Sequence, residues 1–446
     1  MSPRKSMSSR REFLVATSVG VASLETARLV RGVPAGYSAN EKVNVAQIGV
    51  TGKGSADLKG VSDAGGNIVA LCDVDEKHLA SAARQYTTAR QHTDFRKMLD
   101  AQKDIDAVVV TIPDHQHAVA AMAAMVRGKH VYCQKPLTHD ISEARMLRDA
   151  ARKHKVATQM GNQGHAGEGL RTWVDWVKNG AVGNVREVHL WTNRPIWPQG
   201  VERPTDSPPV PAGLNWDLWV GTAPMRPFSP AYHPFKWRGF WDFGTGALGD
   251  MGCHIIDVPF WALDLGGNCK VEAESDGQTP ESGPKSSIVT WHFPAKGKRP
   301  AVVMKWYDGG KMPPQPAGLS DQQWKDAKEG GVMFVGDQGT IAGSRAKLPV
   351  VLGELGKDFK APERTIPKSP GHYVEWLNAC KGGPAAGTNF DYSGPLTETV
   401  LLGNLAIRVN QPIEWDSEKM KTNVPEANAL LRREYRKGWE LEPLSA

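Results

Sequence analysis

Asp250 and His254 stand four positions apart in the segment "GALGDMGCHIID", and a helix there would place both side chains on one face. A histidine beside a carboxylate can exchange a proton with a hydroxyl group near neutral pH. Lys135, in "VYCQKPL", adds a cation that can stabilise an alkoxide or carbonyl oxygen. With a hydride acceptor nearby, these three candidate catalytic residues would be able to oxidise a secondary alcohol.

Two other interpretations of the Asp250–His254 pair remain open. An aspartate and a histidine at this spacing can form a buried pair whose only role is to satisfy each other's hydrogen bonds. The same two residue types also bind metal ions. Because no third ligand lies nearby in the sequence, we predict no metal site.

A glycine-rich turn is the first of the elements that must position these residues. The segment "KVNVAQIGVTGKGSADLKGV" contains a β-branched strand, this turn and the start of a helix. Gly49 and Gly54 fit the outer glycines of the dinucleotide fingerprint G-x-G-x-x-G, whereas Thr51 occupies the middle position. The neighbouring Gly52 can supply the missing backbone freedom. Amide groups of such a turn bind a pyrophosphate, and Lys53 lies among them.

The next strand, "NIVALCDVD", ends in an acidic residue, Asp73, which follows Gly54 by 19 positions. A carboxylate at about this distance accepts hydrogen bonds from the adenosine ribose. It would also repel a 2′-phosphate, so we predict NAD as the cofactor rather than NADP. The alternative is an ordinary strand–turn–helix unit of an α/β protein that binds no nucleotide.

Apolar strands and helices continue to alternate to about residue 160, which predicts a parallel, doubly wound sheet. The segments "TIPDHQH" and "YCQKP" both follow predicted strands. Ligands of such sheets bind beyond the carboxyl ends of the strands. We therefore expect one crevice to be lined by Pro113, His115, His117, Gln134 and Lys135. We assign four of these residues, all but His115, to the binding of the cofactor. The glycine-rich turn is assigned to the cofactor as well.

Residues 191–241 are rich in Pro, Trp and Arg, a composition that excludes one regular helix or strand. We expect a long ordered loop over the active-site face. Trp237 and Arg238 are candidate substrate contacts, because aromatic and guanidinium planes suit the faces and hydroxyl edges of sugars. Asn162 and His165, after the last strand of the first half, are further candidates. The alternative is that the aromatic residues belong to a core or a subunit interface.

The chain resembles the glucose–fructose oxidoreductase/inositol dehydrogenase (Gfo/Idh/MocA) family from about Val43 to the C-terminus. The segments that carry the resemblance are "IGVTGKG", "CDVD", "TDFRKML", "TIPDHQHA", "VYCQKPL", "GALGDMGCHIID" and "GNLAIRVNQPIEWD". The family's Lys-Pro motif matches the segment that begins at Lys135, and its Asp-x-x-x-His motif matches Asp250 and His254.

Two positions depart from the pattern of this family. Thr51 stands where the fingerprint has its middle glycine. Gln134 stands where many members have a glutamate, which affects any role that needs a carboxylate beside the nicotinamide.

The resemblance implies an α/β fold with two domains. An N-terminal Rossmann domain with a doubly wound parallel sheet would be followed by an α/β domain with a large, open, mainly antiparallel sheet. We expect residues 40–160 to bind NAD and residues 161–446 to bind substrate and other subunits, with the C-terminal helices able to pack back on the first domain. The resemblance also implies a homodimer or homotetramer.

Arg10 and Arg11 precede a short apolar run, Phe13 to Leu24, in "SSRREFLVATSVGVASL". Paired arginines before such a run predict a twin-arginine export signal and linker in residues 1–39, and hence a periplasmic or otherwise exported protein. The run is shorter than the about 20 residues that cross a bilayer. No clear cleavage site follows it, so a retained N-terminal anchor stays open, as does a chance arginine pair in a cytoplasmic protein.

Bulk properties exclude several other classes of protein. The 446 residues are 40% hydrophobic and 23% charged, as in ordinary globular proteins. The net charge of +6 is partly due to the N-terminus and no dense Lys/Arg block occurs elsewhere, so we predict no nucleic-acid partner. The five cysteines have no CxxC spacing, which favours buried free thiols over disulfides or zinc ligands.

These observations together predict an exported NAD-dependent oxidoreductase that acts on a small carbohydrate, either a sugar, a polyol or a sugar derivative. The twin-arginine route carries folded proteins, and free NAD is scarce outside the cytoplasm. The cofactor would therefore stay bound and be restored by the reaction itself. A redox-neutral, NAD-dependent glycosidase and a non-catalytic sugar-binding protein of the same fold are the alternatives.

Overall fold

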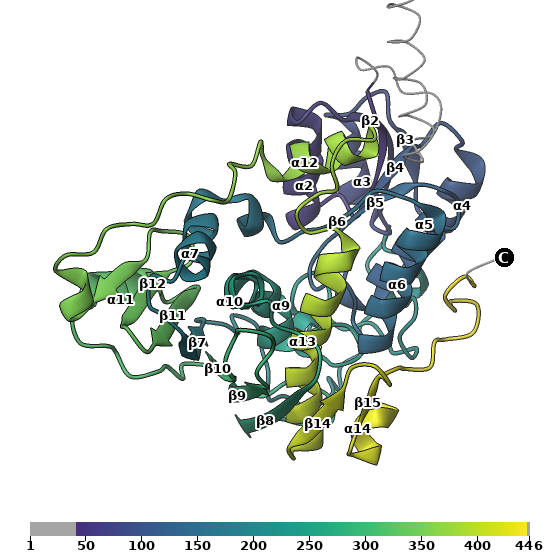
Figure 1. Ribbon diagram of the computed structural model, residues 1–446. Helices are drawn as coiled ribbons and strands as arrows, with labels where there is room; N and C mark the ends of the chain where they lie inside the picture. Colours follow the sequence, from purple (N-terminus) through teal and green to yellow (C-terminus); the bar gives the residue numbers. More distant parts are fainter. Residues whose placement is uncertain (1–41, 444–446) are drawn as a thin grey trace, which may run out of the picture.

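The computed structural model describes residues 42–443, and Figure 1 shows that they are organised around two β-sheets. The first sheet is parallel throughout and has the strand order β3-β2-β1-β4-β5-β6. This order is that of the doubly wound dinucleotide-binding fold, so the predicted Rossmann arrangement is confirmed. Its strands are β1 (Asn44–Ile48), β2 (Asn67–Cys72), β3 (Arg90–His92), β4 (Ala107–Val110), β5 (His130–Cys133) and β6 (Thr158–Met160).

Helices cover both faces of this sheet. They are α2 (Lys53–Asp63), α3 (Glu76–Ala83), α4 (Phe95–Ala101), the short helix η1 (Asp114–Gln116), α5 (His117–Met125) and α6 (Ile141–His154). Successive side chains of a strand point to opposite faces, so the valine-rich central strands feed two apolar clusters. Ala46 and Val108 pack with α4, α5 and α6, whereas Val45 and Val109 pack with α2 and α3.

The second sheet has nine strands in the order β13-β12-β11-β7-β10-β9-β8-β14-β15. Strands β7 and β10 are parallel and the other pairs are antiparallel, which confirms the predicted, mainly antiparallel sheet. The strands are β7 (Val185–Trp191), β8 (Cys269–Asp276), β9 (Ser286–Phe293), β10 (Val302–Asp308), β11 (Gly331–Gly336), β12 (Thr340–Ser344), β13 (Val350–Leu352), β14 (Ile413–Asp416) and β15 (Lys421–Thr422).

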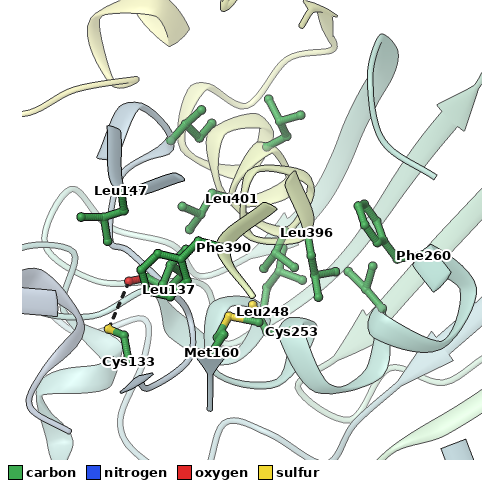
Figure 2. Packing of buried hydrophobic residues seen from close by; sticks show 14 of the residues in the cluster. Cys133, Leu137, Leu147, Met160, Leu248, Cys253, Phe260, Phe390, Leu396 and Leu401 are labelled. Carbon is green, nitrogen blue, oxygen red and sulfur yellow. Dashed lines mark hydrogen bonds between the residues drawn. The ribbon is translucent and has the colours of Figure 1, made fainter. Parts of the chain in front are cut away.

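A long helix, α13 (Phe390–Val409), joins the two halves, because it packs against α6 of the first half and against α9 and β8 of the second. Figure 2 shows Leu396 and Leu401 of α13 among side chains from both halves, including Leu147 and Leu248. The remaining helices are η2 (Gln163–Ala166), α7 (Glu168–Lys178), α8 (Trp216–Val220), η3 (Lys236–Gly239), α9 (Gly246–Ile255), α10 (Asp257–Leu263), α11 (Asp321–Asp326), η4 (Glu354–Gly356), α12 (His372–Cys380) and α14 (Pro425–Ala429).

The segment between β7 and α9, residues 192–245, contains only the short helices α8 and η3 and is called the strap below. It is anchored on the first half. The Asn215 amide donates to the carbonyl of Val74 (2.8 Å), and the Glu76 amide donates to the carbonyl of Gly213 (2.9 Å). The strap therefore lies against the chain that follows β2, beside the predicted ribose site.

Aromatic residues of the strap form an apolar cluster of their own. Trp216 and Trp219 stack with ring centroids 4.6 Å apart, and Trp237 is buried in the same cluster. The prediction of an ordered loop is thus confirmed. These three tryptophans pack in an apolar core, which was the alternative to a role in substrate contact.

The five cysteines are buried and free, as predicted. Within residues 42–443, no helix combines the length and the apolar character that crossing a membrane requires. The predicted twin-arginine signal lies outside the described residues.

Candidate active site

The glycine-rich turn after β1 is shaped by close backbone contacts. A Cβ atom on Gly49 would lie 2.0 Å from the carbonyl oxygen of Thr111, and one on Gly54 would lie 2.1 Å from the carbonyl oxygen of Gly49. Gly52 has φ 56° and ψ −118°, a conformation that side chains rarely adopt, although a Cβ there would meet open space. Gly52 therefore supplies the backbone freedom, and the exposed Thr51 does not need to be glycine.

The turn leads directly into α2, whose first amides are available to a pyrophosphate. Asp73, at the end of β2, ties this turn to the sheet. One of its oxygens accepts from the amide of Val50 and the other from the amide of Asp75, both at 3.0 Å. Burial raises the pKa of Asp73. Each carboxylate oxygen has a second lone pair, so ribose hydroxyls can still donate to it. The turn and Asp73 thus fit a dinucleotide.

Asp57, which the sequence analysis missed, is the centre of a buried polar network on α2. Its carboxylate accepts hydrogen bonds from Thr111 Oγ1 (3.0 Å), Gln134 Nε2 (2.8 Å) and Tyr373 OH (2.7 Å). The ammonium of Lys53 completes the set at 2.5 Å. Lys53 therefore lies beside the pyrophosphate turn but is already paired.

This network accounts for the glutamine at position 134. Its amide donates to Asp57, whereas a glutamate there would bring two carboxylates to hydrogen-bond distance and raise the energy of both. In this protein the carboxylate of the network is thus supplied by α2 and not by position 134.

Lys135 and Asp250 meet across the two halves of the protein. The Lys135 ammonium lies 2.6 Å from Oδ1 of Asp250 and donates to its backbone oxygen at 2.7 Å. Arg238 Nε lies 3.6 Å from the same carboxylate oxygen. Although burial opposes ionisation, the charges of Lys135 and Arg238 keep the pKa of Asp250 below its usual range.

His254 lies one turn further along α9. Its Nδ1 is buried and has no hydrogen-bond partner among the described residues. Burial lowers its pKa well below the usual value, with further contributions from Lys135 and Arg345. The carboxylate of Asp250 is directed to Lys135, and within residues 42–443 no hydrogen bond links it to His254. Asp250 and His254 therefore share one helix, as predicted, but do not form a hydrogen-bonded pair with each other.

The rings of the two histidines after β4 are held by backbone carbonyl oxygens. His115 Nε2 lies 3.1 Å from the carbonyl oxygens of Trp219 and Val220 in the strap. Both ring nitrogens of His117 lie 2.8 Å from backbone carbonyl oxygens, those of Pro136 and Ile112. The two rings therefore hold neighbouring loop segments in place. Pro113 precedes η1 at the same end of the sheet, beside the turn that holds the ring of His117.

Asn162 and His165 are buried and hold Asp257. The Asn162 amide donates to one carboxylate oxygen at 3.0 Å, His165 Nδ1 lies 3.0 Å from the other, and Tyr392 OH donates at 2.5 Å. Asp257 follows His254 by one turn, so these contacts fix the helices of the site. Oδ1 of Asn162 is buried without a partner among the described residues.

Successive residues of η3 have different positions. Trp237 is buried in the strap cluster, whereas Arg238 extends over the Trp237 ring, 4.3 Å from its centroid, to reach Asp250. The structure therefore brings Arg238 to the site and leaves Trp237 behind it as support. Within residues 42–443, no three His, Cys, Asp or Glu side chains are grouped so that they could hold a metal ion.

Comparisons with known proteins agree with this architecture. A family model described as "Oxidoreductase family, NAD-binding Rossmann fold" matches residues 43–162, and one described as "Oxidoreductase family, C-terminal alpha/beta domain" matches residues 189–299. Together they cover more than half of the sequence. The chain belongs to the Gfo/Idh/MocA oxidoreductase family.

Curated relatives match over part of their length. The inositol 2-dehydrogenase of Gluconacetobacter diazotrophicus is 30% identical over 149 residues, which are 32% of this chain and 44% of that protein. The levoglucosan dehydrogenase of Pseudarthrobacter phenanthrenivorans is 24% identical over 151 residues, 34% of this chain and 31% of the relative. The matched stretches thus span less than half of each relative.

Solved structures extend the likeness over most of the fold. The WlbA dehydrogenase from Bordetella pertussis, in complex with NADH and UDP-GlcNAcA, has a TM-score of 0.59 at 17% identity and covers 84% of this chain and 99% of its own. A levoglucosan dehydrogenase in complex with NADH has a TM-score of 0.57 at 16% identity, and the match covers 84% of this chain and 99% of that chain. Such identities establish a shared fold. With the family match, they confirm the predicted NAD cofactor.

Proposed function

We propose that this protein is an exported, NAD-dependent dehydrogenase of a sugar, polyol or sugar derivative, which works as a homo-oligomer and retains its cofactor. The ion pair between Lys135 and Asp250 carries the proposal, because it places a cation from the NAD-binding sheet against α9 of the other half. The names of the relatives, dehydrogenases of inositol and levoglucosan, support a polyhydroxylated substrate.

NAD, when bound, supplies the hydride acceptor, and the chain's own residues act on the substrate hydroxyl. Lys135 Nζ stabilises negative charge on the substrate oxygen. His254, whose pKa is lowered, is neutral near pH 7 and can accept the hydroxyl proton. Its Nδ1 is buried, so Nε2 is the nitrogen that exchanges this proton. Asp250 stays ionised and holds Lys135 in position.

Residues 40–160 would bind NAD, through the amides between Gly49 and Gly54 and through Asp73, and residues 161–446 would supply the substrate side. Retention of the cofactor is supported by the strap. Its backbone hydrogen bonds to Val74 and Glu76 lie immediately beyond Asp73, so the strap borders the ribose site and would slow release of the nucleotide.

The proposal is tested on protein purified from the exported fraction without added nucleotide. After denaturation, released NAD(H) is quantified, and in parallel the absorbance of reduced nicotinamide is followed in native protein during addition of a sugar panel. Stoichiometric nucleotide that a sugar reduces in place is the expected result. Glycoside cleavage without net reduction would favour the redox-neutral alternative, and freely exchanging NAD would overturn retention.

Export is tested separately by cell fractionation. Conservative replacement of the arginine pair, Arg10→Lys with Arg11→Lys, should leave the protein in the cytoplasm if residues 1–39 direct twin-arginine transport. Unchanged distribution of this double variant would contradict export by that route.

A further inference from the structure

Arg345, immediately after β12, reaches the candidate active site from a part of the chain that neither family model covers. Its guanidinium lies between two glycines. A Cβ on Gly164 would be 2.7 Å from Nη1 of Arg345, and a Cβ on Gly330 would be 2.8 Å from Nε. The absence of side chains at these two positions is what makes room for the guanidinium. Gly164 belongs to η2, so Arg345 packs on the turn that also carries His165.

Arg345 is partly exposed, unlike the buried Arg171 and Arg226, and it also differs from them in its partners. Arg171 donates to Glu375 at 3.0 Å, and Arg226 donates to Glu281 at 2.8 Å. For the Arg345 side chain, by contrast, the described residues provide no hydrogen bond and no ion pair. Burial accordingly lowers its pKa, and the charge of Asp257 opposes this only in part. An arginine nevertheless remains charged at neutral pH.

The nearest anionic groups are already engaged. Asp257 accepts hydrogen bonds from Asn162 and Tyr392 and contacts His165. Asp250 is paired with Lys135. Arg345 is close enough to His254 to help lower the pKa of its imidazole. The substrate side therefore carries one more cation than its own carboxylates neutralise.

We propose that Arg345 binds a carboxylate of the substrate, so that the substrate class is an acidic sugar such as a uronic or aldonic acid. The inference rests on the proposed dehydrogenase function and names its substrate class. A planar guanidinium forms two parallel hydrogen bonds with a carboxylate, which fixes orientation as well as affinity. With the acid held by Arg345, a hydroxyl group elsewhere on the sugar is directed towards Lys135 and His254. Arg345 packs on Gly164 and Gly330, neither of which belongs to the pyrophosphate turn, so we assign it to the substrate rather than to the cofactor.

The first test compares acidic and neutral sugars with purified full-length protein that carries its cofactor. The probe pairs are D-glucuronate with D-glucose and D-gluconate with D-glucitol. Wild-type protein should prefer the acid of each pair. Arg345→Met should raise KM for the acids by about 10- to 100-fold, the value of a lost charge-assisted hydrogen bond, while kcat changes little. For the neutral sugars, the fall in kcat/KM should be at least about tenfold smaller than for the acids.

Two further variants separate substrate binding from a structural role. Arg345→Lys keeps the charge but not the paired hydrogen bonds, so KM for the acids should fall between those of wild type and Arg345→Met. Arg152→Met is the matched control, because Arg152 is exposed and pairs with Asp391 at 2.6 Å away from the site. Equal losses for acidic and neutral sugars in Arg345→Met would overturn the proposal.

The second test needs no turnover. Phenylglyoxal modifies accessible arginines, and mass spectrometry locates the modification. D-glucuronate or D-gluconate should protect Arg345, whereas D-glucose and D-glucitol should not. Equal protection by acidic and neutral sugars, or protection by glucose 6-phosphate alone, would overturn the carboxylate assignment.

The two tests distinguish failure of this inference from failure of the proposed function. If neutral sugars reduce the bound nucleotide and acids neither react nor protect Arg345, the dehydrogenase stands and the acidic substrate is wrong. If acids protect Arg345 but no sugar reduces the nucleotide, the acid-binding site stands and the dehydrogenase proposal fails.

Discussion

The NAD side and the substrate side of the candidate site differ in how their ionisable groups are paired. On the NAD side, both oxygens of Asp73 accept backbone amides, and Asp57 accepts hydrogen bonds from side chains on several elements. On the substrate side, His254 Nδ1 is buried without a partner in the described part of the chain, and the partly exposed Arg345 side chain has no ion pair there. Leaving a buried polar group unpaired costs about 1–3 kcal/mol.

This difference in pairing predicts which substitutions should change the stability of the protein and which should change its kinetics. The carboxylates of the NAD side belong to networks that also hold the fold, so their replacement should change stability and cofactor affinity together. His254 and Arg345 on the substrate side have no such network among the described residues, so their replacement should change turnover or KM more than stability. Variants that violate this division would show that the two sides are not built differently.

Lys135→Met is the variant with the largest expected effect. Loss of the preorganised ammonium should lower kcat by about 100- to 1,000-fold, because the developing charge on the substrate oxygen loses about 3–4 kcal/mol of stabilisation. Bound NAD should be retained, since the glycine-rich turn and Asp73 are untouched. The control is Lys59→Met, whose ammonium also lies 2.6 Å from an aspartate, Asp63, but on the surface of α2. Unchanged turnover in Lys135→Met would remove the dehydrogenase mechanism.

Substitutions that remove the Asp57 carboxylate, or place a second carboxylate at position 134, test the polar network around Asp57. Asp57→Asn should lower the free energy of unfolding by about 2–3 kcal/mol, because Lys53, Gln134 and Tyr373 lose a charged acceptor. Gln134→Glu should destabilise by placing a second carboxylate beside the first. The control is Asp63→Asn, an exposed carboxylate on the same helix.

The double variant is the decisive member of this series. Asp57→Asn with Gln134→Glu restores one carboxylate and one amide in exchanged positions, so it should be less destabilised than the sum of the single variants by about 1–3 kcal/mol. Denaturant unfolding and NAD affinity should recover in parallel. Additive effects would show that the two side chains do not compensate each other.

The residues of the candidate site could be predicted from the sequence where they lie close together along the chain. The glycine-rich turn and Asp73 form a contiguous motif whose spacing is fixed by a strand, a turn and a helix, and both were predicted. Asp57 and Gln134 are 77 residues apart. Arg345 comes from a third region of the chain. Only the packing of α2 and β12 brings these residues to the crevice, and no spacing rule encodes that packing.

For other predicted site residues, the sequence locates the element but not the direction of the side chain. His115 follows β4, at the carboxyl end of the sheet, yet the strap offers carbonyl oxygens that attract its ring. Trp237 and Arg238 are adjacent, but η3 directs one to an apolar cluster and the other to Asp250. Position along the chain predicts the edge or the loop, whereas the direction of a side chain depends on distant neighbours.

Two buried histidines, His254 and His372, should make the free energy of unfolding depend on pH. Both His254 and His372 have lowered pKa values, that of His372 to about 3, so below about pH 6.5 the unfolded chain binds more protons than the folded one. Stability should therefore fall as pH decreases through 6.5, by up to about 1.4 kcal/mol per pH unit for each such histidine.

Single substitutions separate the two contributions. His254→Gln should flatten the pH dependence of unfolding and cost little at pH 8, because Nδ1 has no partner in the described structure. His372→Gln should also flatten it, but at a cost at every pH, since His372 contacts Gln159 and the carbonyl of Met160. His292→Gln, at a half-exposed position on β9, is the control. An unchanged slope in His254→Gln would contradict its lowered pKa.

Thr51→Gly should have the smallest effect, although it restores the glycine that the fingerprint expects. The left-handed backbone that the turn requires is at Gly52, with φ 56°, so a glycine at 51 gains no conformation the turn uses. It would instead increase the freedom of the unfolded chain and cost about 0.5–1 kcal/mol of stability. NAD affinity should stay close to that of wild type, whereas Gly52→Ala should weaken it. Tighter NAD binding by Thr51→Gly would show that the threonine side chain, and not the backbone, limits approach of the pyrophosphate.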